Sequence, residues 1–430
     1  MVKSTSKINC MEKIFLKTKL AFFFLGASFF LASCLKDKIT RTYQIRTPVY
    51  EVLTKFREQI KSGAATNITN AGKIAVVGKY IFVSELYKGI HVIDNSNPSQ
   101  PKNVAFISVP GNEDMAISGS TLYADAYSDL VTFDITDPTN VVAKNFAANV
   151  FPDHSIYYSA YYANPDSINV IVDWIVKDTT VDYVPNSGGG IIFYSPGCAN
   201  CATIAQNMSN TNAGSSGISG SLSRFAVLNN YLYTVSTSQL SSFDISSKFE
   251  PTFKSNFTVD WHVETIYPFK GKLFVGTNNG MYMYDAQASP SNPTPLGQFT
   301  HVRGCDPVVA DDNYAYVTIN DSSACLGFNN ELQIVNVQDL SNSFLVKSYQ
   351  LKHPIGLSKD GDNLFICDGT DGLKVYNAAD VNNLQLLKQL KDGNVFDVIA
   401  ENGLAIVMAK DGIYEYDYSD LNNIHLISKL

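Results

Sequence analysis

Short hydrophobic and aromatic runs recur along the chain, separated by turns rich in Gly, Asn, Asp and Pro. Between Lys73 and Val109 there are four such runs, and the third ends at Asp94. These turn residues favour chain reversal, because each supplies either an unusual backbone conformation or a local hydrogen bond. The pattern therefore predicts four short antiparallel strands within about forty residues.

The same four-strand unit returns along the rest of the sequence, and each unit has an acidic or amide residue at the end of its third run. These marker residues are Asp94, Asp134, Asp244, Asp285, Asn336, Asn377 and Asp417, with spacings of 40, 110, 41, 51, 41 and 40. A nearly fixed period of this size is typical of a repeat architecture. Four strands per period predict an all-β fold, a β-propeller of four-stranded blades. We expect each marker side chain to cap the turn that leads into the fourth strand.

The segments Gly89–Pro98 and Leu130–Pro138 carry the motifs Gly-Ile-His-Val-Ile-Asp-Asn-Ser-Asn-Pro and Leu-Val-Thr-Phe-Asp-Ile-Thr-Asp-Pro. This pattern resembles the LVIVD repeat family, which occurs in bacterial cell-surface and secreted proteins and is regarded as propeller-forming. The resemblance extends roughly from Lys73 to Leu430, apart from a middle insertion. The later units depart from it, with Asn336 and Asn377 in place of Asp. The family carries no agreed biochemical activity, so the resemblance implies a fold and leaves the function open.

The period breaks at about residues 151–219, and this irregular stretch affects the blade count. Seven blades are favoured; the alternative is eight, with residues 153–195 forming a degenerate blade around Asp173, which lies 39 residues after Asp134. The expected organisation is a signal peptide at 1–33, a lipidated tether with a short helix at 34–72, and the propeller at 73–430.

The N-terminal segment predicts the location of the protein. Lys13, Lys17 and Lys19 precede an apolar run that is too short to span a bilayer comfortably, as in a secretory signal peptide. Leu31-Ala-Ser-Cys34 follows and resembles a bacterial lipobox, which implies that Cys34 is acylated, for example with palmitate, and becomes the mature N-terminus. Acyl chains on one residue would anchor the protein to a membrane. We therefore expect a lipoprotein of the outer membrane, facing the periplasm or the cell surface.

Composition and cysteine positions agree with a domain outside the cytoplasm. The formal net charge is −8, so the chain has no basic character suited to nucleic acid. In an oxidising compartment, pairs of cysteines favour disulfides. The candidates are Cys198 with Cys201, and Cys305 with Cys325. Cys367 falls where the first unit has Ser84, a position expected to be buried, so a free structural thiol is predicted there.

Aligning the units on their markers gives a candidate ligand site. Counting back twenty or twenty-one positions from a marker reaches the start of the innermost strand, and several of these positions are charged. They are Asp114, Arg224, Glu264, Asp306 (once an insertion before Asn336 is removed) and Asp397. Equivalent positions in a propeller form a ring, so these side chains are expected to converge at one mouth of the axial channel.

Two interpretations of this ring remain open. It could line a water-filled tunnel with a structural ion-pair network, or bind a ligand or a hard cation such as Ca²⁺, since like charges are costly unless paired or neutralised. No catalytic motif and no metal-binding motif accompanies the ring, and no cofactor is expected. The sequence thus favours a non-enzymatic binding or scaffold module with an envelope protein or glycan as partner. The alternative is a surface hydrolase or lyase acting on glycan or peptide through the tunnel mouth.

Overall fold

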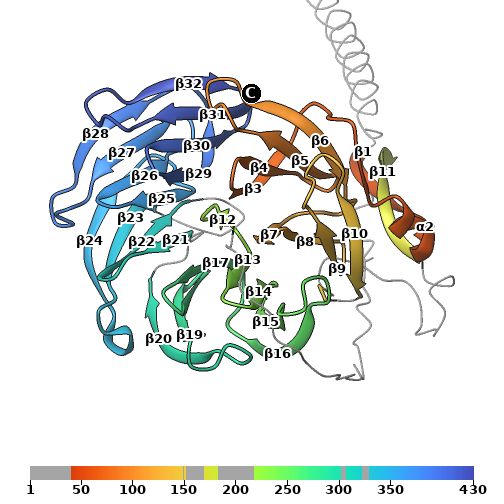
Figure 1. Ribbon diagram of the computed structural model, residues 1–430, viewed down its shortest axis with the longest axis horizontal. Coiled ribbons are helices and arrows are strands. Elements are labelled where there is room, and N and C mark those ends of the chain that lie inside the picture. The colour runs from red at the N-terminus through yellow and green to blue at the C-terminus, as the bar shows by residue number, and fades with distance from the viewer. Residues whose placement is uncertain (1–39, 149, 152–168, 183–216, 302–306, 322–328) are drawn as a thin grey trace, which may run out of the picture. The chain divides into compact units, whose positions relative to one another are not determined.

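The computed structural model describes residues 40–148, 150–151, 169–182, 217–301, 307–321 and 329–430. The chain forms two compact units, Met1–Val49 with Asp173–Ile204, and Tyr50–Val172 with Ala205–Leu430. β1 (Thr40–Val52) and β11 (Asn169–Asp182), which lie mostly in the first unit, form a two-stranded sheet. The second unit is a seven-bladed β-propeller, which confirms the predicted fold (Figure 1). The eighth blade is not observed, because the described part of the proposed degenerate blade belongs to the β1–β11 sheet.

Each blade is built from four consecutive antiparallel strands. Blade 1 contains β3 (Ala71–Val77), β4 (Tyr80–Glu85), β5 (Gly89–Asp94) and β6 (Lys102–Ser108). Blade 2 contains β7 (Met115–Ser118), β8 (Thr121–Ala126), β9 (Asp129–Asp134) and β10 (Val142–Ala147). Blade 3 contains β13 (Phe225–Leu228), β14 (Tyr231–Val235), β15 (Gln239–Asp244) and β16 (Thr252–Thr258). Blade 4 contains β17 (Val263–Phe269), β18 (Lys272–Thr277), β19 (Gly280–Asp285) and β20 (Thr294–Thr300).

The last three blades follow the same order. Blade 5 contains β21 (Val308–Ala310), β22 (Tyr314–Ile319), β23 (Glu331–Asn336) and β24 (Phe344–Gln350), with the 3-10 turn η3 (Leu340–Asn342) before β24. Blade 6 contains β25 (Leu357–Asp360), β26 (Asn363–Cys367), β27 (Leu373–Asn377) and β28 (Gln385–Leu390). Blade 7 contains β29 (Val395–Glu401), β30 (Leu404–Ala409), β31 (Gly412–Asp417) and β32 (His425–Lys429).

The marker residues act as the sequence predicted. Each accepts a hydrogen bond from the backbone N–H two positions further on, as Asp94 does from Ser96 at 2.9 Å and Asp417 does from Ser419 at 2.8 Å. The other five markers make the same bond. This local turn, in which a short side chain replaces a backbone partner, starts the reversal into the fourth strand of every blade.

A helix and a short strand ahead of blade 1 pack against the propeller. The helix α2 (Leu53–Glu58) buries Phe56, and its Arg57 Nη2 lies 2.6 Å from Asp129 Oδ2 of blade 2. β2 (Lys61–Gly63) pairs with β6 as an additional outer strand of blade 1. Residues 53–63, placed in the expected tether, are therefore part of the folded propeller unit. None of the described helices has both the length and the hydropathy needed to cross a bilayer.

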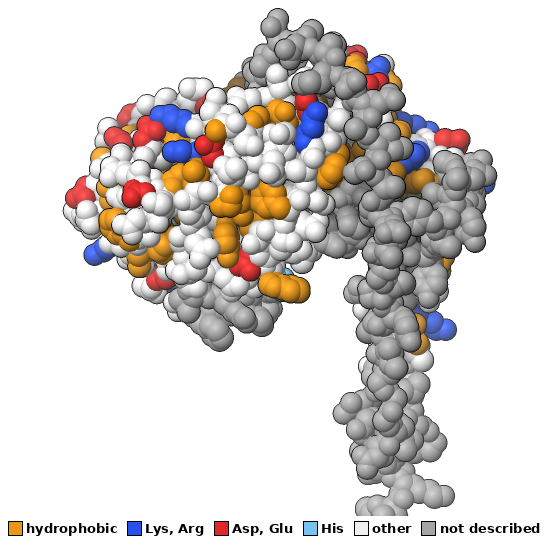
Figure 2. Space-filling model, turned by 90° about the horizontal axis from the view of Figure 1, so that it is seen from below, with side chains coloured by type: hydrophobic (Ala, Val, Ile, Leu, Met, Phe, Trp, Pro, Cys, Tyr) orange, Lys and Arg blue, Asp and Glu red, His pale blue; other side chains and the backbone are white. Residues whose placement is uncertain are grey.

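Blades pack face to face, and the outer strands carry several of the exposed hydrophobic side chains. Examples are Val142 of β10, Phe253 of β16, Phe344 of β24 and Leu386 of β28. Figure 2 views the rim and shows hydrophobic patches separated by polar surface.

Cys367 is fully buried in β26 with a free thiol whose pKa is raised by burial, as expected for a structural cysteine.

The ring closes between blades 1 and 7 by side-chain packing, and the described strands of the two blades stay in separate sheets. Ile74, Ile81, Val83 and Ile93 of blade 1 share a buried cluster with Ile399, Ile406, Met408 and Ile413 of blade 7. Asn95 Nδ2 also donates to Glu415 Oε2 across this junction, at 2.8 Å. Because the two sheets remain separate, this hydrophobic contact carries the closure of the ring.

We expect Met408→Ala to lower the free energy of unfolding by about 2–5 kcal/mol, because the substitution leaves a cavity in this closing interface. Equilibrium unfolding in urea would measure the loss. The matched control is Phe344→Ala, which removes a side chain 54% exposed on the rim and should change stability by less than about 0.5 kcal/mol. Equal effects of the two substitutions would contradict a closing role for Met408.

Candidate functional site

A segment of the chain passes through the axial channel of the propeller. We call residues 217–224 the plug; it contains β12 (Ile218–Ser219), which pairs antiparallel with β3 and lies near the centre of Figure 1. Gly217 N donates to Ile117 O at the far end of β7, whereas Arg224 N donates to Asp114, just before β7 begins. The plug therefore runs the length of the innermost strands, and blade 3 begins where it ends.

Side chains and backbone groups from five blades hold the plug. Blade 1 pairs with it through β3, and blade 2 accepts its Gly217 N–H at 2.8 Å. In blade 4, Ile266 N donates to Ser223 O at 2.9 Å. In blade 6, Leu357 N donates to Ser221 Oγ at 2.8 Å, and in blade 7 Asp397 Oδ1 accepts from the same hydroxyl at 3.3 Å. Protein therefore occupies the axis over this stretch, where one of the two interpretations placed a water-filled tunnel.

Two of the predicted ring carboxylates, Asp114 and Asp397, converge on the plug. Asp114 is 1% exposed; its Oδ1 accepts from Met115 N at 2.6 Å and from Ser223 Oγ at 3.4 Å, and its Oδ2 accepts from Arg224 N. Asp397 is fully buried, and besides Ser221 its Oδ1 accepts from Val398 N at 3.0 Å. Its Oδ2 is buried without a hydrogen-bond partner among the described residues. Both groups therefore act on the plug, below the solvent-exposed mouth.

Burial raises the pKa of both carboxyl groups. The pKa of Asp114 rises to about 6 and that of Asp397 to about 7, because desolvation penalises the charged form. The ammonium of Lys73 partly offsets this rise for both groups, and repulsion from Asp114 adds to it for Asp397. The two carboxyls and Lys73 thus form one electrostatic unit around the plug.

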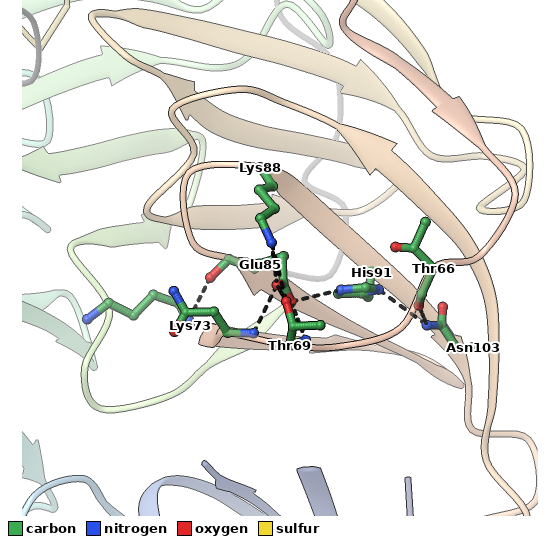
Figure 3. A network of polar contacts seen from close by, with 9 residues as sticks. Thr66, Thr69, Lys73, Glu85, Lys88, His91 and Asn103 are labelled. Atoms are coloured by element: carbon green, nitrogen blue, oxygen red, sulfur yellow. Dashed lines mark hydrogen bonds and ion pairs between the residues drawn. The ribbon is translucent and has the colours of Figure 1, made fainter. Parts of the chain in front are cut away.

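The sequence analysis did not include Lys73 in the ring, although counting back from the marker of blade 1 reaches it. It lies twenty-one positions before Asp94, so it occupies the ring slot of blade 1, between the blades of Asp397 and Asp114. Its Nζ donates to Leu222 O of the plug. Figure 3 shows its side chain pointing away from the neighbouring Glu85 cluster. The equivalent position in blade 6 is Gly356. A Cβ atom at this position would lie 2.6 Å from Asp397 Oδ1, so a glycine is needed here to leave space for the carboxyl group.

The polar cluster around Glu85 in Figure 3 is structural. Glu85 accepts from Thr69 N at 3.0 Å, from Asn70 N at 2.9 Å and lies 3.2 Å from His91 Nε2. These bonds outweigh desolvation and lower the pKa of Glu85 to about 2. Asp125 and Asp368 hold the loops of their own blades in the same way, by accepting backbone N–H groups of residues 113–114 and 352–353. An acidic residue at the end of the second strand therefore fixes the loop that enters the first strand.

Two further ring residues, Arg224 and Glu264, lie at the mouth of the channel. Arg224 donates its backbone N–H to the buried Asp114, while its guanidinium points elsewhere, with Nη1 3.9 Å from Glu113 Oε2. Arg224 and Glu264 line an open pocket of about 310 Å³ together with Thr237, His262 and Val263. Asp306 lies outside the described residues, as do Cys198, Cys201, Cys305 and Cys325. The predicted ring is thus divided between a buried part that holds the plug and an open part that forms the mouth pocket.

The described side chains form no cluster suited to a metal ion. Among residues 40–148, 150–151, 169–182, 217–301, 307–321 and 329–430, no three His, Cys, Asp or Glu residues are arranged to hold one. The two ring carboxylates at the plug instead accept hydrogen bonds from backbone and serine groups, and the charge of Lys73 acts on both.

Comparisons with known proteins agree with this fold. A model described as the LVIVD repeat matches residues 69–106 and 219–259, so LVIVD repeats are present in blades 1 and 3. The periplasmic gluconolactonase PpgL of Pseudomonas aeruginosa is similar in structure, with a TM-score of 0.53, 10% identity and coverage of 83% of this chain and 96% of that one. The computationally designed protein Ika8 has a TM-score of 0.50 and 8% identity, covering 85% and 88%. No curated protein matches the sequence.

The raised pKa of Asp397 predicts a pH-dependent stability. Because its pKa in the folded protein, about 7, exceeds the unfolded value near 3.8, ionisation penalises the folded state as the pH rises between these values. Asp397→Asn cannot ionise, so wild-type stability should fall relative to this variant by at most about 1.4 kcal/mol per pH unit between pH 4 and 7. Urea unfolding across this pH range would measure the difference.

The matched control is Asp417→Asn, which changes an exposed carboxyl whose pKa is lowered by hydrogen bonds from Ser419. The contribution of Asp417 is lost only as the pH falls below its ordinary range, so the difference between this variant and the wild type should be constant from pH 4 to 7. A difference for Asp397→Asn that is equally constant would contradict the buried, uncharged state of Asp397 at low pH.

Proposed function

We propose that this protein is a lipid-anchored module of the bacterial outer membrane that binds an envelope component through the mouth of its propeller. The proposal rests on the positions of the ring residues: Asp114 and Asp397 hold the plug, whereas Arg224 and Glu264 line the mouth pocket. Because the plug occupies the channel, a ligand has access to the mouth pocket and not to a tunnel. The pocket has mixed polar and apolar walls in loops and at the strand ends next to them, which is the arrangement expected of a binding site.

Binding is favoured over hydrolysis by the roles of the buried carboxyls. Asp114 and Asp397 have the raised pKa values that a catalytic acid needs, but both are used to hold the plug and are fully buried. In the open pocket, the Arg224 guanidinium has N–H donors and no acceptor atom, so it is suited to hydrogen-bonding a ligand. The likeness to a gluconolactonase concerns the fold and supplies no catalytic residue.

The binding proposal predicts the effect of removing the Arg224 side chain. Its backbone N–H, which holds Asp114, is retained in Arg224→Ala, and its ion pair with Glu113 is long and partly exposed. We therefore expect the melting temperature to change little, whereas retention of envelope components on the immobilised protein should fall. Quantitative comparison of the material eluted from wild-type and variant columns would measure this.

Lys254→Ala provides a matched control, because it removes one cation from an ion pair with Asp244 on the outer part of blade 3, away from the pocket lining. Its column should retain the same material as the wild type. Identical retention by the wild type and Arg224→Ala would reject the mouth as the binding site. Turnover of an envelope glycan or peptide by the wild type would instead favour an enzyme.

The anchor is tested at Cys34, on the basis of the Leu31-Ala-Ser-Cys34 motif. In cells given an alkyne-labelled palmitate analogue, the wild-type protein should incorporate the label and sediment with membranes, and Cys34→Ser should do neither. Cys10→Ser is the matched control, since it removes the cysteine within the expected signal peptide and should leave labelling unchanged. Label retained by Cys34→Ser would refute the proposed anchor.

A further inference from the structure

One loop at the mouth holds a tryptophan in an exposed position. Trp261, between β16 and β17, is 77% exposed, which is the largest exposure among the described large hydrophobic side chains. Its loop is fixed by the carboxylate of Asp260, whose Oδ1 accepts from Trp261 N at 2.7 Å and whose Oδ2 accepts from Tyr282 Oη at 2.9 Å. Exposing an indole to water opposes the hydrophobic effect, so an exposed indole on a hydrogen-bonded loop points to a contact surface.

The backbone next to Trp261 has an unusual conformation at a residue that lines the pocket. His262 has φ +56°, a left-handed conformation that is unusual for a residue with a Cβ. Its carbonyl accepts from Asn278 N at 3.1 Å, and the following Val263 N donates to Thr237 O at 2.9 Å. Strain of this kind persists where surrounding structure enforces it, and it is concentrated at functional sites.

The polar groups of the pocket suit hydroxyl groups better than a charged ligand. Thr237, His262, Glu264 and Arg224 together offer donors and acceptors on short or planar side chains. The Arg224 charge already faces Glu113. Among the described residues, Glu264 in the pocket and Asp260 nearby in the chain make the local charge balance acidic, which disfavours anionic ligands. An uncharged ligand with many hydroxyl groups avoids the desolvation cost of a buried charge.

We infer that the mouth pocket binds a neutral carbohydrate, with the Trp261 ring against the apolar face of a sugar and the four polar side chains hydrogen-bonded to its hydroxyls. This inference rests on the proposed binding function and specifies its ligand class. Trp261 directly precedes the lining residues His262 and Val263 in the chain. An aromatic ring together with polar groups matches a sugar ring, which has an apolar C–H face and a polar edge. The pocket volume of about 310 Å³ is at the small end for ligand sites, which fits recognition of one or two sugar units of a longer chain.

The sequence contains two tryptophans, Trp174 and Trp261, so the experiment can isolate one of them. In a Trp174→Phe background, fluorescence reports on Trp261 alone. Titration with a panel of neutral oligosaccharides should shift the emission to the blue for at least one member, because stacking removes the indole from water. The same sugar should bind at least about tenfold more weakly to Trp261→Ala, measured by calorimetry, and Trp261→Phe should recover part of the affinity.

Phe253→Ala removes an exposed aromatic side chain from the outer strand of blade 3 and should leave sugar binding unchanged. Uronate-containing oligosaccharides and a lysine-rich peptide complete the panel. The inference is overturned if no neutral sugar binds below millimolar concentration, if only the peptide or the uronates bind, or if Trp261→Ala binds as well as the wild type. If envelope components are still retained through Arg224 in those cases, the binding function stands and only its ligand class is wrong.

Discussion

The structure depends on the contact between the plug and the blades that surround it. Residues 217–224 replace solvent along the axis with backbone and serine groups that bond to blades 1, 2, 4, 6 and 7. A propeller without such a segment has unpaired inner strand edges facing the channel. Here β12 pairs with the inner edge of blade 1, and the buried carboxyls of blades 2 and 7 accept from the rest of the plug. The mouth pocket exists because the plug ends at Arg224.

The acidic residues have different structural roles, and the role of each follows from how its carboxyl group is solvated. Exposed marker carboxylates such as Asp94 accept nearby N–H and hydroxyl groups, which lowers their pKa. Glu85 is shielded but receives several donors, so its charge is also favoured. Asp397 has an oxygen that no described residue reaches with a donor, so burial prevails and its pKa rises. The same side-chain type thus caps turns, fixes loops or holds the plug according to the number of donors that reach it.

The repeat made most of the fold predictable from sequence. Asp94 and Asp417 are local caps, so their function depends on the two residues that follow, and a sequence pattern records such short-range contacts. The count of twenty or twenty-one residues also placed Asp114, Arg224 and Asp397 at the axis. It did not reveal that Arg224 turns its guanidinium towards Glu113, because rotamer direction is set by neighbours from another blade. The plug was not predictable, because it lies in the stretch where the period fails and its partners are distant in sequence. Trp261 was not predictable either, because it lies in a loop and is not part of the repeated pattern.

The position of the plug between blades 2 and 3 has a consequence for the order of assembly. The segment precedes five of the seven blades in the chain, yet it ends up inside the ring that those blades complete. A finished ring could admit it only by opening, since its two ends lie at opposite ends of the innermost strands. During synthesis from the N-terminus, blades 3 to 7 can instead wrap around it in sequence, with the docking of blade 7 on blade 1 as the last step. The plug is then in place before the ring closes, whereas a permuted chain that made the plug last would have to thread it into a closed ring.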